Sequence, residues 1–469
     1  MGESKRLIKN TGIIAIGNLC TKLVTFLLLP LYTSILSTAE YGTVDYVTSI
    51  SIFLVPVSTL LMDEAVFRFL IDCRTEQDRE RVITSSMALF LLGMVATLIV
   101  LVPILIFLRY RYAVLLVLFV LSSSTLQIVS SLLRGLGKTS SYAVLNFIAG
   151  FTTVVLNVLF IAVFRWGVLG MLSASVVGQF LAPAVFVVHL RLWREIKPKA
   201  YSKKTAQELF RYALPLIPNK VSWTIMNLSD RLVIMNTIGA SSSGLYAVSY
   251  KFPNAMDMVY GFFYMSWKES SARALGSDED EGAFYNLVYD KLKRFMMSVV
   301  IGMTACMPLV FKLLVADSYN EAILYVPVLL LATYYSNISG FYGGIFTAYK
   351  DTKVMGTTTV VAAVLNLVLN LVLISYLGLW GSSLATLAAT FVVNEYRRVK
   401  VKAYVSLAGG YRFAAASYAV LALVLALYYW GTTMGIVLML VIAAIFFLVA
   451  NREMVGAVLH RLEKKGIHG

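Results

Sequence analysis

Apolar residues recur along the whole chain in stretches of about 20, a length that lets one helix cross the hydrocarbon core of a bilayer. Short polar connections separate these stretches. The pattern predicts an all-α polytopic membrane protein with about fourteen transmembrane helices. We expect the helices near residues 11–35, 43–67, 83–108, 112–133, 142–164, 167–189, 211–236, 244–268, 295–316, 322–346, 355–377, 379–396, 411–430 and 433–450.

The composition agrees with a membrane protein, since 59% of the 469 residues are hydrophobic, 14% are charged, and the mean hydropathy is +0.78. The longest polar connections have roughly 20 to 30 residues, which is too short for a soluble catalytic domain. We therefore expect a protein that is not an enzyme and holds no cofactor. The three cysteines, Cys20, Cys73 and Cys306, are too widely separated to indicate a disulfide framework or a metal site.

Lysine and arginine gather in alternate connections, which indicates the orientation of the helices. One set of connections, together with both termini, holds most basic residues, among them Lys5, Arg74, Arg134, Lys197, Lys350, Arg397, Arg398 and Lys464. The opposite set holds little beyond Arg109, Arg111 and Arg165. Both termini are therefore predicted to be cytoplasmic. This bias and the anionic inner leaflet account for the net charge of +15, so no nucleic-acid partner is expected.

An internal repeat predicts the domain organisation. Val155-Leu156-Asn157-Val158-Leu159 matches Val368-Leu369-Asn370-Leu371-Val372, and each is followed by a similar turn, Gly167-Val168-Leu169-Gly170 and Gly378-Leu379-Trp380-Gly381. The copies are six helices apart, an even number, so the repeats run in the same direction unless the similarity is chance. We predict an N-lobe (1–190, helices 1–6), a basic cytoplasmic linker (191–210), a C-lobe (211–396, helices 7–12), and two extra C-terminal helices with a cytoplasmic tail (397–469). A substrate cleft between the lobes is expected.

Short motifs in the N-terminal half carry a resemblance to a known family. They are Lys9-Asn10-Thr11, Pro30-Leu31-Tyr32, Glu40-Tyr41-Gly42 and Leu133-Arg134-Gly135-Leu136-Gly137-Lys138. The chain resembles the oligosaccharide repeat-unit (Wzx-type polysaccharide) flippases of the MATE/MOP exporter superfamily, which also contains the MurJ-type lipid II flippases.

The resemblance implies a MATE-like fold in the bacterial cell membrane and alternating access. It implies as substrate an undecaprenyl-pyrophosphate-linked oligosaccharide, moved from the inner to the outer leaflet for cell-surface polysaccharide biosynthesis. Membrane lipids and a polysaccharide polymerase are the partners it suggests. Sugar identity is left open.

Cations inside the apolar stretches are candidates for binding the pyrophosphate. A basic side chain at mid-bilayer costs about 2.5–3.5 kcal/mol, so it is expected to face a cavity or a partner. The candidates are Lys22, Lys220, Arg231 and Lys251, with Asn227 on the same helical stripe as Lys220 and Arg231. The alternative is that each forms a structural pair or snorkels; for Arg68 we favour a pair with Glu64, one turn earlier.

A second group is a candidate site for a coupling cation, Na⁺ or H⁺. Asn366 and Asn370 share a helix face, and Asp230 and Thr386 are predicted at a similar depth. One carboxylate with amide and hydroxyl oxygens suits a hard monovalent cation. The MurJ-type relatives have a sodium site on the corresponding helices, with a second carboxylate where this chain has Asn370. The alternative is a pair between Asp230 and Arg231 or Lys251, with the asparagines bonding between helices.

Two other functions compete with the oligosaccharide flippase: a MATE-like cation-coupled drug exporter and a MurJ-like lipid II flippase. A pocket for cationic drugs should be acidic, whereas the predicted mid-membrane charge is mainly basic. An enzyme would need a sizeable loop or paired acids at a membrane face, and neither is present in the sequence.

Overall fold

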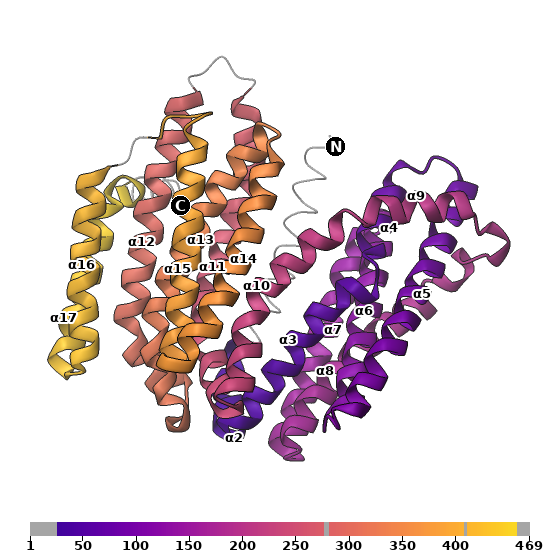
Figure 1. The fold of residues 1–469 in the computed structure, drawn as a ribbon, viewed down its shortest axis with the longest axis horizontal. Coiled ribbons are helices and arrows are strands. Elements are labelled where there is room, and N and C mark those ends of the chain that lie inside the picture. The colour runs from indigo at the N-terminus through magenta and orange to yellow at the C-terminus, as the bar shows by residue number, and fades with distance from the viewer. Residues whose placement is uncertain (1–25, 276–280, 408–409, 457–469) are drawn as a thin grey trace, which may run out of the picture. The chain divides into compact units, whose positions relative to one another are not determined.

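The computed structural model describes residues 26–275, 281–407 and 410–456, all of the described elements being helical (Figure 1). The chain divides into two compact units, one ending at Gly244 and the other beginning at Leu245. The first predicted span, residues 11–35, lies mostly outside the described residues, and Lys22 lies there too.

The first unit is built from long helices joined by short connections. Its elements are α2 (Leu29–Ile35), α3 (Thr38–Ser58), α4 (Met62–Asp72), α5 (Glu76–Phe107), α6 (Ala113–Gly135), α7 (Thr139–Asn157) with the π-helical turn η1 (Val158–Val163), α8 (Gly167–His189), the 3₁₀ turns η2 (Leu192–Glu195) and η3 (Pro198–Ala200), α9 (Lys203–Ala213) and α10 (Leu216–Thr237). Its main apolar core lies between α4, α5, α6, α7, α8 and α9.

The second unit contains the remaining helices. They are α11 (Ala240–Ala274), whose first residues belong to the first unit, then α12 (Glu281–Leu314), the 3₁₀ segment η4 (Asp317–Tyr325), α13 (Val326–Ala348), α14 (Thr352–Leu377), α15 (Leu379–Val401), α16 (Tyr411–Trp430) and α17 (Thr433–Ala450). In this unit α15 packs against both α13 and α14.

The prediction of an all-α polytopic membrane protein is confirmed. Among the described residues nine helices are long and apolar enough to cross a membrane, and a tenth span results if the bent pair α3 and α4 counts as one. Helices α10, α11 and α15 coincide with predicted spans but are more polar. The predicted number of fourteen is reached only if these three and the first span also cross.

The second predicted span is broken rather than continuous. Helices α3 and α4 meet at an angle of 47°. Leu60 and Leu61 between them have φ values of 50° and 51°, a region that costs non-glycine residues energy. The Thr59 hydroxyl accepts the Leu61 N–H at 3.2 Å, a local bond that competes with the helical pattern. Leu61 is buried in the core, so packing holds the strained turn in place.

The compact units differ from the predicted lobes at their boundary. Helix α10, which the sequence assigns to the C-lobe of residues 211–396, packs on α3 and belongs to the first unit. The predicted linker, residues 191–210, is structured. It forms η2, η3 and the start of α9, and the Ser202 N–H donates to the hydroxyl of Ser85 on α5 at 3.2 Å. Amphipathic packing of α9 onto α4 and α5 therefore extends the first unit beyond residue 190.

The internal repeat forms a helical hairpin in both copies, although Val158 and Leu159 belong to the π-helical turn η1 in the first copy and residues 368–372 lie within the α-helix α14 in the second. Gly167 and Gly378 begin corresponding turns with φ values of 55° and 57°, which favour glycine. Each turn returns the chain antiparallel against the preceding helix, pairing α7 with α8 and α14 with α15. The repeated sequence thus corresponds to a repeated helical hairpin, one in each unit.

Candidate functional site

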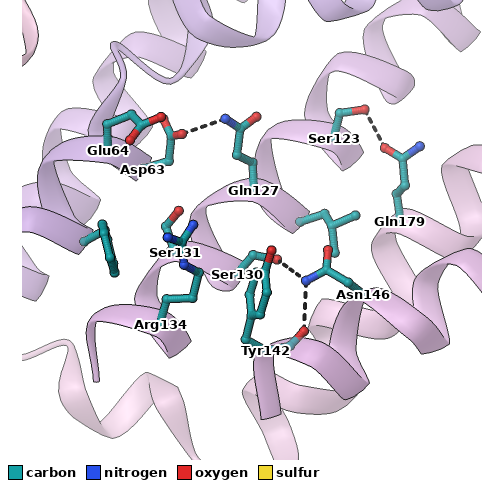
Figure 2. Close-up of a pocket in the computed structure, with 12 residues that line it drawn as sticks. Asp63, Glu64, Ser123, Gln127, Ser130, Ser131, Arg134, Tyr142, Asn146 and Gln179 are labelled. Atoms are coloured by element: carbon teal, nitrogen blue, oxygen red, sulfur yellow. Dashed lines mark hydrogen bonds between the residues drawn. The ribbon is translucent and has the colours of Figure 1, made fainter. Parts of the chain in front are cut away.

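A polar pocket of about 430 Å³ opens within the first unit (Figure 2). Its twelve lining residues come from α4, α6, α7 and α8. The break between α3 and α4 forms the pocket locally, because it starts a new helix inside the span and places Asp63 and Glu64 in its first turn.

The floor of the pocket is a buried carboxylate. Asp63 is 2% exposed and accepts a hydrogen bond from Gln127 Nε2 at 2.6 Å. The hydroxyl of Thr59 approaches the other carboxylate oxygen at 3.4 Å. The N-terminal end of α4 also favours negative charge. These contacts offset the cost of placing a carboxylate in the interior of the unit.

The walls of the pocket are held by hydrogen bonds between and within helices, drawn as dashed lines in Figure 2. Ser123 on α6 donates to Gln179 Oε1 on α8. Asn146 on α7 donates through Nδ2 to the hydroxyl of Ser130 at 3.2 Å and to the carbonyl oxygen of Tyr142 at 2.9 Å. The bonds fix the orientation of two amide side chains, Gln179 on α8 and Asn146 on α7.

The mouth of the pocket carries one acidic and one basic side chain, Glu64 and Arg134, and both are exposed. The Arg134 guanidinium lies over the rings of Phe67, at 4.2 Å from the centroid, and Tyr142, at 5.5 Å. Arg134 belongs to one of the motifs that carry the family resemblance. From the sequence it was expected only as part of a basic connection.

This pocket was not predicted from the sequence. Asp63, Gln127, Asn146 and Gln179 are polar residues within or beside predicted spans, and such residues are a general signal of function in membrane proteins. That signal was applied to cations and to the helices of residues 211–396, and the amides Gln127, Asn146 and Gln179 were not considered.

Of the predicted headgroup-binding residues, Arg231 is the best defined. Its Nε donates to Asp45 Oδ2 on α3 at 2.8 Å, and the two side chains are 12% and 20% exposed. Asp45 was not among the predicted residues. An ion pair is what the structural alternative for Arg231 predicts. A substrate contact of Arg231 has to compete with Asp45.

The other two predicted cations whose side chains the structure describes lie on different helices. Lys220 is exposed on α10, and Lys251 is half-buried on α11 in the second unit. The side chain of Asn227 and the whole of Lys22 lie outside the described residues. A joint headgroup site of these residues stays a prediction. Arg68 pairs with Asp72 at 2.7 Å rather than with Glu64; both carboxylates are one turn from Arg68 on α4, and Glu64 lines the polar pocket.

Three of the four residues predicted to bind a coupling cation form a buried network in the second unit. Asn366 Nδ2 donates to Thr386 Oγ1 at 3.3 Å, and Asn370 Nδ2 donates to Asn366 Oδ1 at 3.0 Å. Asp230 is buried in the first unit, so its meeting with them stays a prediction. Within the described ranges, no group of three or more histidine, cysteine, aspartate and glutamate side chains is placed to hold a metal ion.

Solved transporters share this fold. The inward-facing structure of a multidrug resistance MATE family transporter of the MOP superfamily matches with a TM-score of 0.69 and 15% identity, over 83% of this chain and 98% of that one. The lipid II flippase MurJ, in an inward closed conformation, matches with a TM-score of 0.69 and 14% identity, over 94% and 99%. The apolar helices define a polytopic all-α membrane protein, and its fold is the one that these solved transporters have.

Comparison by sequence gives the family. The model of the family described as "Polysaccharide biosynthesis protein" matches residues 7–267, more than half of the chain. The chain therefore belongs to the polysaccharide biosynthesis protein family. An uncharacterized membrane protein of Methanocaldococcus jannaschii is 25% identical over 315 residues, covering 61% of this chain and 71% of the relative.

Proposed function

We propose that the protein flips undecaprenyl-pyrophosphate-linked oligosaccharide repeat units from the inner to the outer leaflet of the bacterial cytoplasmic membrane. The observation that carries the proposal is membership of a polysaccharide biosynthesis family by a chain whose fold is that of membrane transporters. A transporter contributes to polysaccharide synthesis by moving a lipid-linked intermediate to the side where a polymerase uses it. It performs no chemistry on the glycan.

The pyrophosphate is the part of the substrate that needs cations. Lysine and arginine bind phosphate oxygens by charge-assisted hydrogen bonds, which strengthen in low dielectric. We assign this contact to Arg231, Lys22, Lys220 and Lys251, with Asn227 as a neutral donor. Arg231 is paired with Asp45, so the incoming headgroup would compete with that carboxylate. The pair would then hold the arginine until substrate arrives.

Coupling to an ion gradient is the second part of the proposal. Asp230, Asn366, Asn370 and Thr386 would supply oxygen ligands to Na⁺, or Asp230 would carry a proton, as the lobes alternate their access. The buried network of Asn366, Asn370 and Thr386 supports a polar site at this position. Replacing sodium in a transport assay, or collapsing the proton gradient, distinguishes the two ions.

The test is export of the glycan in the organism that carries the gene, after deletion and complementation. We expect Arg231→Ala and Lys22→Ala to lower surface polysaccharide at least about tenfold, the equivalent of about 1.4 kcal/mol, while lipid-linked repeat units accumulate. Arg231→Lys should retain partial export, since lysine keeps the charge but loses the planar fork. Immunoblots of membranes check abundance, and Arg412→Ala, a change at an exposed arginine on α16, is the matched control.

Asp45→Asn separates a substrate contact from a structural ion pair. If Arg231 acts on the headgroup, Asp45→Asn keeps the arginine available and preserves more export than Arg231→Ala does. Equal losses from the two variants would show that the pair only stabilises the fold. Accumulation of lipid II after deletion, or loss of resistance to cationic drugs with normal surface polysaccharide, would instead support a MurJ-like or a MATE-like function.

A further inference from the structure

We propose that the pocket of the first unit is a subsite for a neutral sugar of the lipid-linked glycan, separate from the cations that bind its pyrophosphate. The inference rests on the proposed function and adds the part of the substrate that this pocket receives. No residue of the pocket is among the predicted headgroup or coupling-ion residues.

The chemistry of the lining matches a polyhydroxylated ligand. Of the twelve lining residues, seven are uncharged and polar, three are charged and two are apolar. A sugar hydroxyl both donates and accepts, so it requires donors and acceptors side by side. Amide side chains provide both from one planar group, and Gln127, Asn146 and Gln179 present three of them in this pocket.

The hydrogen bonds within the walls leave complementary atoms for a ligand. Gln179 accepts the hydrogen bond from the Ser123 hydroxyl through Oε1, so its Nε2 group is not used in that bond. Asn146 makes both of its bonds through Nδ2, so its carbonyl oxygen is not used in them. One wall therefore offers a donor and the other an acceptor, in orientations that are fixed before binding. Such preorganisation reduces the entropy cost of recognition.

The charges of the pocket select against the pyrophosphate. Asp63 and Glu64 contribute two carboxylates and Arg134 one guanidinium. Arg134 lies against aromatic faces at the exposed mouth, whereas Asp63 is buried at the floor. A concentrated anion would be repelled from the floor, but a hydroxyl could donate to the carboxylate. Sugar and pyrophosphate are thereby directed to different residues.

The size and polarity of the pocket distinguish a sugar from a coupling ion or a drug. A volume of about 430 Å³ is within the range of about 300–1,000 Å³ for small-molecule sites and far exceeds the need of a bare cation. Pockets for drug-sized ligands are mainly apolar and aromatic, whereas only Phe67 and Leu126 here are apolar. A hydroxyl-rich ligand is the class that fits both properties.

The experiment measures sugar binding directly. The intact protein in lipid nanodiscs is titrated with glucose, galactose, mannose, rhamnose, N-acetylglucosamine and N-acetylgalactosamine, and contacts are detected by saturation-transfer NMR. At least one sugar should bind, and Gln179→Leu and Asn146→Leu should each weaken it about tenfold or more. Thr125→Val and Ser175→Ala are matched controls, since both hydroxyls lie on the same helices as pocket residues but donate to backbone carbonyls outside the pocket.

The two pocket variants lie on different helices. If melting curves show that one of them is unfolded, sugar binding by the other still tests the subsite. Binding that both variants leave unchanged, or no binding by any sugar of the panel, would overturn the subsite. The subsite would also be overturned if the protein bound no sugar and instead bound tetraphenylphosphonium in a way that requires Asp63. That result would indicate a drug pocket.

Transport of the native lipid-linked glycan in proteoliposomes separates this inference from the proposed function. If the wild type flips the glycan and Gln179→Leu flips it equally well, the subsite fails and the flippase stands. If the wild type flips no lipid-linked glycan, the proposed function fails. Reduced flipping by Gln179→Leu and Asn146→Leu, with controls intact, supports both.

Discussion

Arg397 shows how a single charge is accommodated inside the helical packing. It is 5% exposed on α15, whereas its place in the sequence predicted a charge in a basic connection. Its Nε donates to Thr358 Oγ1 at 2.9 Å, and its terminal nitrogens donate to Thr359 Oγ1 at 3.3 Å and to the carbonyl oxygens of Ser339 and Met355. The interpretation as a loop charge was wrong, because the fork of donors satisfies neutral acceptors on α13 and α14.

The first prediction at this scale concerns the identity of that side chain. Arg397→Lys should lower the free energy of unfolding by about 1–3 kcal/mol, because it keeps a buried charge and loses most of the hydrogen bonds that stabilise it. Arg397→Met removes the charge as well and should cost less than Arg397→Lys. Melting temperatures in detergent provide the comparison.

Arg398→Lys is the control for this pair. Arg398 is adjacent, 41% exposed at its side chain, and paired with Glu395. Its change should be almost neutral. A methionine variant less stable than the lysine variant would show that charge, rather than the hydrogen-bond geometry, matters at position 397.

Helix packing depends on glycine where α3 and α11 begin. A Cβ on Gly42 would lie 2.0 Å from the carbonyl oxygen of Ala240, and one on Gly244 would lie 1.9 Å from the carbonyl oxygen of Thr38. The hydroxyls of Thr38 and Ser241 are 2.6 Å apart at the same crossing. Small residues therefore let the two backbones approach directly, as at other close helix crossings in membranes.

The prediction at the scale of elements is that Gly42→Ala and Gly244→Ala each destabilise the protein by about 1–3 kcal/mol or more. The obstructing atoms belong to the backbone, so rotation of a side chain cannot relieve the contact. Gly302→Ala on α12 is the control, since nothing lies within 4 Å of its added Cβ. Size-exclusion profiles and melting temperatures measure the effect. Equal stability of all three variants would contradict the close crossing.

For the whole molecule, the distribution of basic residues predicts the orientation in the membrane. After replacement of Cys20, Cys73 and Cys306, single cysteines are introduced at Lys199 and at Arg111, both of which are exposed. A membrane-impermeant maleimide should label Arg111→Cys in intact cells and Lys199→Cys only after lysis, since basic connections are retained in the cytoplasm. The opposite pattern would invert the orientation.

Some features could be predicted because they depend on neighbouring residues. Hydropathy alone locates helices, and the described helices cover the predicted spans from residue 43 onward. The repeated asparagine and glycine motifs predict similar local structure, and Gly167 and Gly378 have nearly equal φ values. The break at Leu60 and Leu61 was not predicted, since local bonding and core packing at two apolar residues produce it.

The sequence by itself determined that the chain is a membrane protein of repeated helices, because apolar length and turn glycines are properties of short segments. Only the tertiary structure decided which polar side chains meet. Arg231 and Asp45 are 186 residues apart, and Gln127 and Asp63 are 64 apart. Helical periodicity shows which face a side chain occupies and says nothing about which other helix that face contacts. The pocket therefore emerged only once α4, α6, α7 and α8 were packed together.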